Sequence, residues 1–457
     1  MKCSAMEAAT LAGGRLTGSG TEEITSVSIH SGRLTPGALF VALPGERTDG
    51  HDYMAAAFAN GAAACMGSRV PEGLEDRPVV LVPDPAEGLL ALGAGWRQRF
   101  DIPVVGLTGS VGKTTTKEMT AAVLSARYRT LKTEGNLNNH LGVPLTLCRM
   151  SEEAEAAVVE MGMSGFGEIE RLARAVRPTV AMVLNIGVSH IGMLGSREGI
   201  LRAKMEIVQG LRPDGPLIVN GDEPLLMMAV RNVRHPIVTF GLDTPGLDLS
   251  AWEIREEEGR TVFTAVWRGE PFPVRVAAVG IHNVKNALAA LAAGLSIGLS
   301  PEEAAAGLAT YAPPPMRQQI YERNGFVILE DCYNASPDSI EAALSVLQTL
   351  PGEGRRFAVL GGIRELGDYA PAIHRTCGRM AADAADLLYF FGEGAEEYRE
   401  GALKAGADPS KVHVFSDRAE LARALRKEAR PGDRLLFKGS RMMKMEEALR
   451  LFLEGDR

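Results

Sequence analysis

Apolar strand-like runs alternate with helical stretches over most of the chain, and this alternation constrains the fold more than any other feature. The runs at 156–162, 179–187 and 216–222 are followed by segments of helical character such as 197–211. Strands and helices alternating at this spacing predict a largely parallel sheet covered by helices on both faces. We therefore expect an α/β protein whose ligands bind beyond the carboxyl ends of the strands.

Changes of pattern divide the chain into three parts. The first part has short strand-like runs and one expected helix at 53–65, and residues 249–276 alternate polar and apolar side chains as antiparallel strands do. Three successive prolines within 311–319 stiffen the clearest break. We predict three domains, namely a small α/β domain (1–100), a central P-loop-like ATPase domain with appended antiparallel strands (101–313) and a smaller Rossmann-like α/β domain (314–457).

Composition excludes several classes of protein. The formal charge of −8 disfavours non-specific nucleic-acid binding. The most apolar window, 276–299, includes His282 and Lys285, which are costly in lipid, so we expect no membrane span. The first residues lack the pattern of a secretory signal. Five scattered cysteines without a CxxC pair fit a reducing cytoplasm, with neither a disulfide frame nor a zinc site.

The stretch VVGLTGSVGKTT, residues 104–115, reads as a strand, a glycine turn and the start of a helix. A Walker loop would have its first glycine where Leu107 stands, so the spacing is unusual. A plain turn with a solvated lysine is the alternative. The Gly-Lys-Thr-Thr run in this context favours a phosphate site, in which Lys113 reaches the β/γ-phosphates and Thr114 holds Mg²⁺.

Polar side chains stand where strands should end. Glu160, Asn185 and His190 follow neighbouring runs, and beside the glycine loop they suggest a magnesium site. Each one alone could be a solvated loop residue. On the residues alone, Lys204 reads as a surface lysine on an amphipathic helix. Asn283 and Asn286 at the start of the helix near 281 could cap it, or with the imidazole of His282 could read a purine edge. Asp331, Asn334, Lys438 and Arg441 are candidate ligand contacts at the strand ends of the last part, or solvated groups.

The chain carries, in this order, TGSVGKTT, EGNLNNHLGVP, EMGMSGFGEI, NIGVSHIG, AKMEI, GIHNVKNALAA, DCYNASPDS, RELG and KGS. In this order and spacing the motifs resemble the Mur ligases, the ATP-dependent amide-bond ligases of bacterial cell-wall synthesis. YNASPDS, RELG followed by a histidine, and KGSR are similar to the members that add D-Ala-D-Ala to UDP-muramyl-tripeptide. The DNPR signature of the ligase that adds the third amino acid is absent.

The resemblance implies a cytoplasmic, monomeric enzyme of peptidoglycan synthesis, which supports cell shape and division. It implies ATP, two Mg²⁺ ions, and CO₂ bound as a carbamate on Lys204, with Gly106 at the strand end as the family's extra glycine. The implied catalytic residues are Lys113, Lys204 and His190, and the metal ligands Thr114, Glu160, His190 and Lys204. Implied nucleotide contacts are Gly109, Ser110, Val111, Gly112, Lys113, Thr114, Thr115, Asn283, Asn286, Arg317 and Asp331. Implied contacts to the UDP-muramyl or acceptor substrate are Ser31, Thr133, Asn136, Asn138, Asn139 and Asn334.

The chain departs from the family pattern at a few positions. His30 and Gly32 replace an aspartate and an arginine near the expected uridine site, and Cys332 and Ser336 replace an acidic residue and an asparagine. These positions lie outside the implied metal set, so we expect ligase activity. The alternatives are another ligase of the superfamily, such as a different muramyl ligase or a folylpolyglutamate-type synthase, and a regulatory or transport ATPase. The discriminating feature is the set Glu160, His190 and Lys204, because a simple ATPase has no need of a carbamylated lysine.

Overall fold

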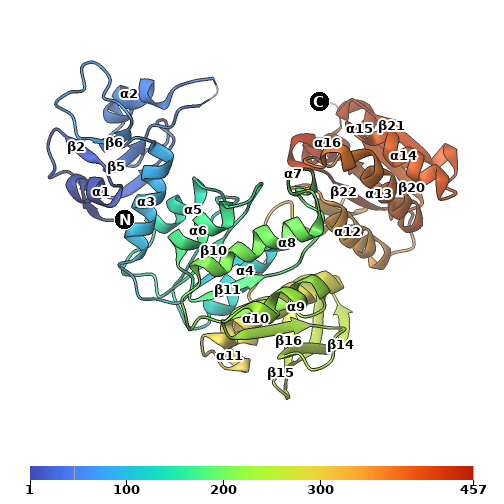
Figure 1. Cartoon of the computed structure of the whole chain (residues 1–457). Coiled ribbons are helices and arrows are strands. Elements are labelled where there is room, and N and C mark those ends of the chain that lie inside the picture. Colours follow the sequence, from blue (N-terminus) through green and yellow to red (C-terminus); the bar gives the residue numbers. More distant parts are fainter. Residues whose placement is uncertain (46, 456–457) are drawn as a thin grey trace.

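The computed structural model describes residues 1–45 and 47–455. Within that part of the chain the strands form three larger sheets, one after another along the sequence, and one two-stranded sheet. Figure 1 shows them as three lobes, the N-terminal in blue, the central in green and yellow, and the C-terminal in orange and red. The predicted α/β class, with mainly parallel sheets, is confirmed.

The N-terminal lobe is built on a five-stranded sheet in the order β2-β7-β6-β5-β4. The helix predicted over 53–65 is wrong in its second half, because α2 stops at Ala59 and residues 62–67 form β6. Gly61 has φ +94°, which ends the helix, and β6 then pairs with both β5 and β7. The strands are β1 (Cys3–Ser4), β2 (Arg15–Thr17), β3 (Glu23–Ile24), β4 (Ser26–Ser28), β5 (Ala38–Val41), β6 (Ala62–Gly67) and β7 (Val79–Leu81), with helices α1 (Ala5–Leu11) and α2 (Met54–Ala59).

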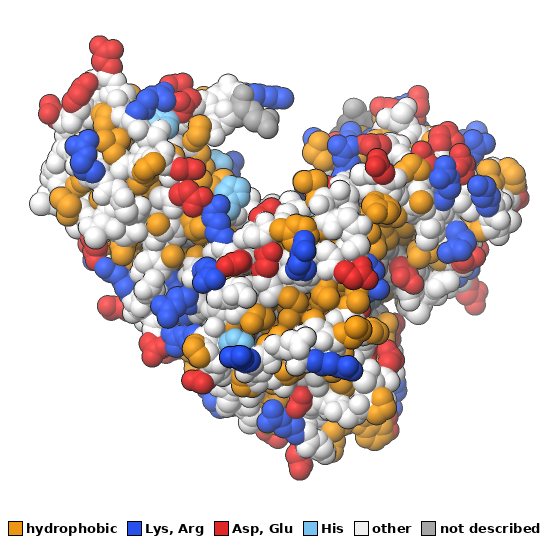
Figure 2. Space-filling model, in the orientation of Figure 1, with side chains coloured by type: hydrophobic (Ala, Val, Ile, Leu, Met, Phe, Trp, Pro, Cys, Tyr) orange, Lys and Arg blue, Asp and Glu red, His pale blue; other side chains and the backbone are white. Residues whose placement is uncertain are grey.

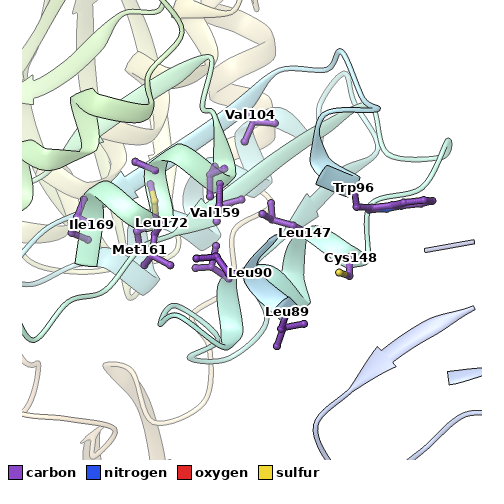
Figure 3. Close-up of a cluster of buried hydrophobic side chains, with 14 of the residues drawn as sticks. Leu89, Leu90, Trp96, Val104, Leu147, Cys148, Val159, Met161, Ile169 and Leu172 are labelled. Carbon is purple, nitrogen blue, oxygen red and sulfur yellow. The ribbon is translucent and has the colours of Figure 1, made fainter. Parts of the chain in front are cut away.

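Helix α3 (Pro85–Arg97) joins the N-terminal lobe to the central lobe. Figure 3 shows its Leu89 and Trp96 in one buried cluster with Leu147 of α5 (Gly142–Cys148) and Leu172 of α6 (Glu168–Val176). The two lobes therefore share a hydrophobic core. Arg97 is buried at the end of α3 and donates hydrogen bonds to the carbonyl oxygens of Val176 (3.0 Å), Phe100 (2.5 Å) and Arg177 (3.3 Å).

The central lobe contains a nine-stranded sheet in the order β16-β15-β14-β13-β12-β11-β8-β10-β9. In this order, every neighbouring pair between β14 and β9, including those that involve β8, is parallel. Strands β14, β15 and β16 form the predicted antiparallel extension. Helices α4, α10 and α11 pack on one face, and α5, α6 and α8 on the other. The strands are β8 (Val104–Thr108), β9 (Thr130–Lys132), β10 (Ala156–Glu160), β11 (Val180–Val183), β12 (Leu217–Asn220), β13 (Ile237–Gly241), β14 (Leu249–Glu257), β15 (Arg260–Trp267) and β16 (Glu270–Val276). The remaining helices are α4 (Lys113–Leu124), α7 (Ile191–Leu194), α8 (Arg197–Met205), α9 (Pro224–Ala229), α10 (Ile281–Ser296) and α11 (Pro301–Leu308).

The C-terminal lobe contains a six-stranded sheet in the order β17-β18-β22-β19-β20-β21, in which only the β17–β18 pair is antiparallel. Helices α12, α13 and α14 pack on one face, and α15 and α16 on the other. The strands are β17 (Gln319–Arg323), β18 (Phe326–Asp331), β19 (Arg356–Gly361), β20 (Leu387–Phe391), β21 (Val412–Phe415) and β22 (Arg434–Lys438). The helices are α12 (Pro337–Thr349), α13 (Ala370–Ala384), α14 (Ala395–Lys404), α15 (Arg418–Glu428) and α16 (Met445–Glu454), with the 3₁₀ turn η4 (Gly367–Tyr369). No helix among residues 1–45 and 47–455 is long and apolar enough to cross a membrane.

Candidate active site

A cleft of about 1040 Å³ lies between the carboxyl ends of the central strands and the C-terminal lobe. Its lining residues come from these two lobes, while Figure 2 shows a wide gap between the N-terminal and C-terminal lobes. Glu160 ends β10 and Asp331 ends β18, so polar side chains do meet at the strand ends, as the sequence predicts. The cleft is therefore where ligand chemistry is expected in an open α/β fold.

The glycine loop at 109–112 connects β8 to α4, and its residues Ser110, Val111 and Gly112, but not Gly109, line one wall of the cleft. Asn185, which follows β11, holds the loop, because its Oδ1 accepts from the N–H groups of Ser110 and Val111 at 3.0 Å each. The ammonium of Lys113 donates to the carbonyl oxygens of Gly109 (2.8 Å) and Ser110 (3.3 Å), and burial lowers its pKa. A loop preshaped in this way, ahead of a helix N-terminus, suits a polyphosphate.

Gly106 does not lie at the end of its strand, as the resemblance implied. It is inside β8, where an added Cβ would come within 2.8 Å of the Met161 side chain and 3.1 Å of Pro178. Its small size thus serves the packing of the central sheet, away from the residues that line the cleft.

Glu160 has the features of a cation ligand. Its Oε1 accepts from Asn138 Nδ2 (2.8 Å) and Thr114 Oγ1 (3.4 Å), while its Oε2 is buried and has no hydrogen-bond partner among residues 1–45 and 47–455. A buried carboxylate oxygen without a donor is costly unless a cation approaches it. Within the same described ranges, no three His, Cys, Asp or Glu side chains form a metal-binding group. The protein fits Mg²⁺, which takes one or two carboxylates and completes its shell with water and phosphate.

His190 and Lys204 lie in the same cleft. His190 is at the start of α7 with φ +63°, and its Nδ1 is 2.8 Å from Oε2 of Glu365 in the C-terminal lobe. The Lys204 side chain, on α8, is buried and makes no hydrogen bond or ion pair within the described part of the chain. Burial, with the charge of Lys113 as a second cause, places the pKa of Lys204 well below its usual value. The expectation of a surface lysine is therefore wrong.

Asn283 and Asn286 make hydrogen bonds within the protein. Asn286 Oδ1 accepts from Thr116 Oγ1 (3.2 Å), and Asn286 Nδ2 donates to Asn283 Oδ1 (3.1 Å). Asn283 Nδ2 in turn donates to Gln318 Oε1 (2.7 Å). Both residues line the cleft, but these bonds make them ties between α10, α4 and the segment before β17. Their predicted contact with adenine stays a prediction.

The C-terminal lobe supplies charged groups to the cleft. Arg317 Nη2 donates to Thr114 Oγ1 (3.1 Å), and its guanidinium stacks on the ring of Tyr333. Asp331 forms an ion pair with Lys438 at 2.5 Å, and Lys438 also donates to the carbonyl oxygen of Asn334 (3.1 Å). Arg317, in the segment before β17, therefore connects the C-terminal lobe to Thr114, the residue that the sequence predicts to bind Mg²⁺.

The expected substrate residues divide into two groups. Asn136, Asn138, Asn139 and Asn334 line the cleft. Thr133 is fully buried and accepts from the N–H of Glu160 at 3.0 Å, so it supports Glu160 rather than forming part of the cleft wall. Ser31 lies between β4 and β5 in the N-terminal lobe and is not among the lining residues. Its carbonyl oxygen accepts from Asn60.

Sequence reasoning missed two acidic side chains of the C-terminal lobe. Glu365 follows β19, its Oε2 lies 2.8 Å from Nδ1 of His190, and the neighbouring His190 ring lowers the pKa of the Glu365 carboxyl. Asp338, at the start of α12, lies against Gly187 and accepts from the N–H of Val188 at 3.4 Å. The rule that found Glu160, polar residues after parallel strands, also points to the loop that carries Glu365.

Three family models match this chain. They are the Mur ligase family catalytic domain over residues 23–89, the Mur ligase middle domain over 107–294, and the Mur ligase glutamate ligase domain over 316–441. Together they cover most of the three lobes.

Curated relatives match along nearly the full length. The UDP-N-acetylmuramoyl-tripeptide–D-alanyl-D-alanine ligase of Bacillus subtilis is 41% identical, with 94% of each chain covered, and that of Escherichia coli is 37% identical with the same coverage. Among solved structures, MurF from Acinetobacter baumannii superposes with a TM-score of 0.91 at 33% identity, covering 99% of both chains. The MurF ligase of Thermotoga maritima in complex with ADP gives a TM-score of 0.83 at 30% identity, covering 94% of this chain and 97% of that one.

Proposed function

The chain belongs to the Mur ligase family, and we propose that it joins D-alanyl-D-alanine to UDP-N-acetylmuramoyl-tripeptide at the expense of ATP. The observation that carries this function is the 41% identity over 94% of both chains to the Bacillus subtilis ligase of that activity. The cleft agrees with it, because a phosphate-type loop and the strand ends of the C-terminal lobe face each other across it. The product is a precursor of peptidoglycan.

The chemistry requires activation of the substrate carboxylate, because a carboxylate is a poor acylating agent. Its oxygen attacks the γ-phosphate of ATP and forms an acyl phosphate, with ADP as the leaving group. Lys113 and the N-terminus of α4 lie in the cleft, where they offset the charge that develops on the phosphates. The amine of the dipeptide then attacks the acyl carbon, and the tetrahedral intermediate collapses to the amide and phosphate.

We assign Mg²⁺ binding to Thr114, Glu160, His190 and a carbamylated Lys204, with two ions. Bound Mg²⁺ neutralises charge on the transferring phosphoryl group. The unpartnered Oε2 of Glu160 supports the first ion. For Lys204, burial without a partner favours the neutral amine, which is the form that reacts with CO₂. A carbamate would give this side chain the hard oxygen ligands that Mg²⁺ prefers.

We place the enzyme in the cytoplasm, since its five buried cysteines are free and one of its substrates is linked to a nucleotide. Its product supports cell shape and division, and the enzyme acts as a monomer. The domain boundaries stay at residues 100 and 313, and Ser31 of the first domain remains the candidate contact to the UDP-linked substrate.

Phosphate release by the purified protein tests the function. With ATP and Mg²⁺, release is expected only when UDP-N-acetylmuramoyl-tripeptide and D-Ala-D-Ala are both present. Equal release without either substrate would show a simple ATPase. Release that depends on a single amino acid, or on glutamate with a folate, would instead show another ligase of the superfamily.

The carbamate has its own test. Protein equilibrated with ¹³C-bicarbonate is expected to show one carbamate carbonyl signal by NMR, and the Lys204→Ala variant should lose both that signal and activity, even at high bicarbonate. Lys285→Ala, which removes another lysine that lines the cleft, should keep the signal. An active Lys204→Ala protein, or a signal that survives in it, contradicts the assignment.

A further inference from the structure

Glu365 reaches across the cleft from a loop whose conformation is fixed. The loop follows β19, and Glu365 has φ +65°, which is unusual for a residue with a side chain. His374 Nε2 accepts from the N–H of Ile363 at 3.0 Å, and Ser440 Oγ accepts from the N–H of Arg364 at 3.0 Å. These bonds hold the two residues before Glu365, and the strained backbone then directs its carboxylate to His190 of the central lobe.

The contact leaves one nitrogen of His190 available. Glu365 Oε2 lies 2.8 Å from Nδ1, while Nε2 of His190 has no partner in residues 1–45 and 47–455. The ring N–H is not aligned on the oxygen, so the contact satisfies the distance of an ion pair but not the angle of a hydrogen bond. The Glu365 side chain is 62% exposed. A carboxylate at Nδ1 sets the tautomer that presents the lone pair of Nε2 to a metal.

Other contacts dock the C-terminal lobe on both sides of His190. The N–H of Val188, two residues before it, donates to Asp338. Tyr369 Oη donates to the carbonyl oxygen of Gly195 at 3.0 Å, and a Cβ on Gly192 would lie 2.9 Å from the backbone nitrogen of Gly367. The Glu365–His190 contact therefore depends on α7 and η4 lying against each other, which is a contact between the two lobes.

We propose that Glu365 is a positioning residue that orients His190 toward Mg²⁺, so that docking of the C-terminal lobe completes the metal site. The inference rests on the proposed function in one respect, the assignment of His190 as a metal ligand. Docking of the C-terminal lobe and metal binding then strengthen each other. By linkage, docking raises the metal affinity by the same factor by which bound metal raises the docking equilibrium constant. The lobe that brings the acceptor would then also control the charge on the phosphates.

Direct titration of Mn²⁺, followed by electron paramagnetic resonance in the presence of ADP, tests the inference without turnover. Glu365→Gln is expected to weaken Mn²⁺ binding by about 10- to 100-fold, the usual effect of removing such a partner. In the His190→Ala background the same substitution should have no further effect. Glu393→Gln is the matched control, since Glu393 pairs with Arg364 beside the same loop but does not line the cleft. It should leave Mn²⁺ binding unchanged.

The alternatives give different results. If Glu365→Gln leaves Mn²⁺ affinity unchanged, or weakens it equally with and without His190, the inference is wrong. If only the KM for D-Ala-D-Ala rises, Glu365 binds the incoming amine and does not act through His190. Because the titration needs neither the UDP-linked substrate nor the dipeptide, a failure of the proposed ligase activity would leave its outcome readable. In the active enzyme we expect a higher Mg²⁺ requirement with little change in the KM for the dipeptide.

Discussion

A Cβ atom added to Gly112 would lie 2.5 Å from the side-chain oxygen of Asn286. Gly112 has φ +77° at the turn into α4, a conformation that residues with a side chain avoid. Asn286 cannot easily move away, because its oxygen accepts from Thr116 and its amide donates to Asn283. The glycine of the Gly-Lys-Thr run is therefore required both by the turn and by the helix α10 that packs against it.

We accordingly expect Gly112→Ala to reduce ADP affinity by at least about tenfold and to lower the free energy of unfolding by about 2 kcal/mol. Calorimetric titration and urea unfolding measure the two effects. Gly167→Ala is the matched control, because Gly167 also precedes a helix at φ +80° but has open space around its Cβ position. It should lose about 1 kcal/mol of stability and keep its ADP affinity. If the two substitutions reduced ADP affinity equally, the close approach of Asn286 to Gly112 would not be what ADP binding requires.

Arg97 provides a second test, of the coupling between the N-terminal and central lobes. Arg97→Met removes the guanidinium that donates to three carbonyl oxygens, and these oxygens then have no hydrogen bond from residue 97 in a buried site. The free energy of unfolding should therefore fall by about 3 kcal/mol. Urea unfolding measures the loss. Arg99→Met serves as the control, because Arg99 is partly exposed and pairs with Glu7 at the surface, which predicts a change below about 1 kcal/mol. A similar loss in both variants would mean that the buried bonds contribute little.

The sequence predicted those parts of the site that depend on strand order. Glu160 ends β10, Asn185 follows β11 and Asp331 ends β18. Parallel strands present their carboxyl ends to one edge of their sheet, which is why these positions could be predicted. The phosphate-type loop was predicted from the Gly-Lys-Thr-Thr run between a strand and a helix, despite its spacing. The helix predicted over 53–65 was partly wrong because small apolar residues fit a buried strand as well as a helix, and Gly61 decided between them.

Side-chain directions outside the strands could not be predicted. Thr133 and Lys204 are buried only because α8 and the loop after β9 pack against other elements, which no local pattern reveals. Glu365 reaches His190 through a contact between residues 175 positions apart, so its partner depends on how two lobes dock. Resemblance to a family supplied the predicted role of Lys204, which stays a prediction, and the structure adds that this side chain is buried in the cleft.

Asp222 follows β12 and pairs with Lys285 near the start of α10. Its carboxylate accepts from the N–H groups of Leu242 (2.8 Å), Asp243 (3.0 Å) and Thr244 (3.0 Å) and lies 2.9 Å from Nζ of Lys285. Burial acts to raise the pKa of Asp222, but the hydrogen bonds from Leu242 and Lys285 outweigh it, and the pKa is lowered. The ionised carboxylate therefore stabilises the folded state above the unfolded pKa of about 3.9.

This stabilisation should disappear as the pH falls from about 4 through the lower pKa of the folded state, because both states then hold the proton. At about pH 7, Asp222→Asn should lower the free energy of unfolding by about 2 kcal/mol, and the difference from the unmodified protein should narrow below about pH 4. Urea unfolding from about pH 7 to about pH 3 measures it. Asp243→Asn is the control, since Asp243 is 79% exposed and also pairs with Lys285, so its effect should stay below about 1 kcal/mol. A difference for Asp222→Asn that stays constant across this range would show that the charge of Asp222 is not what stabilises the turn.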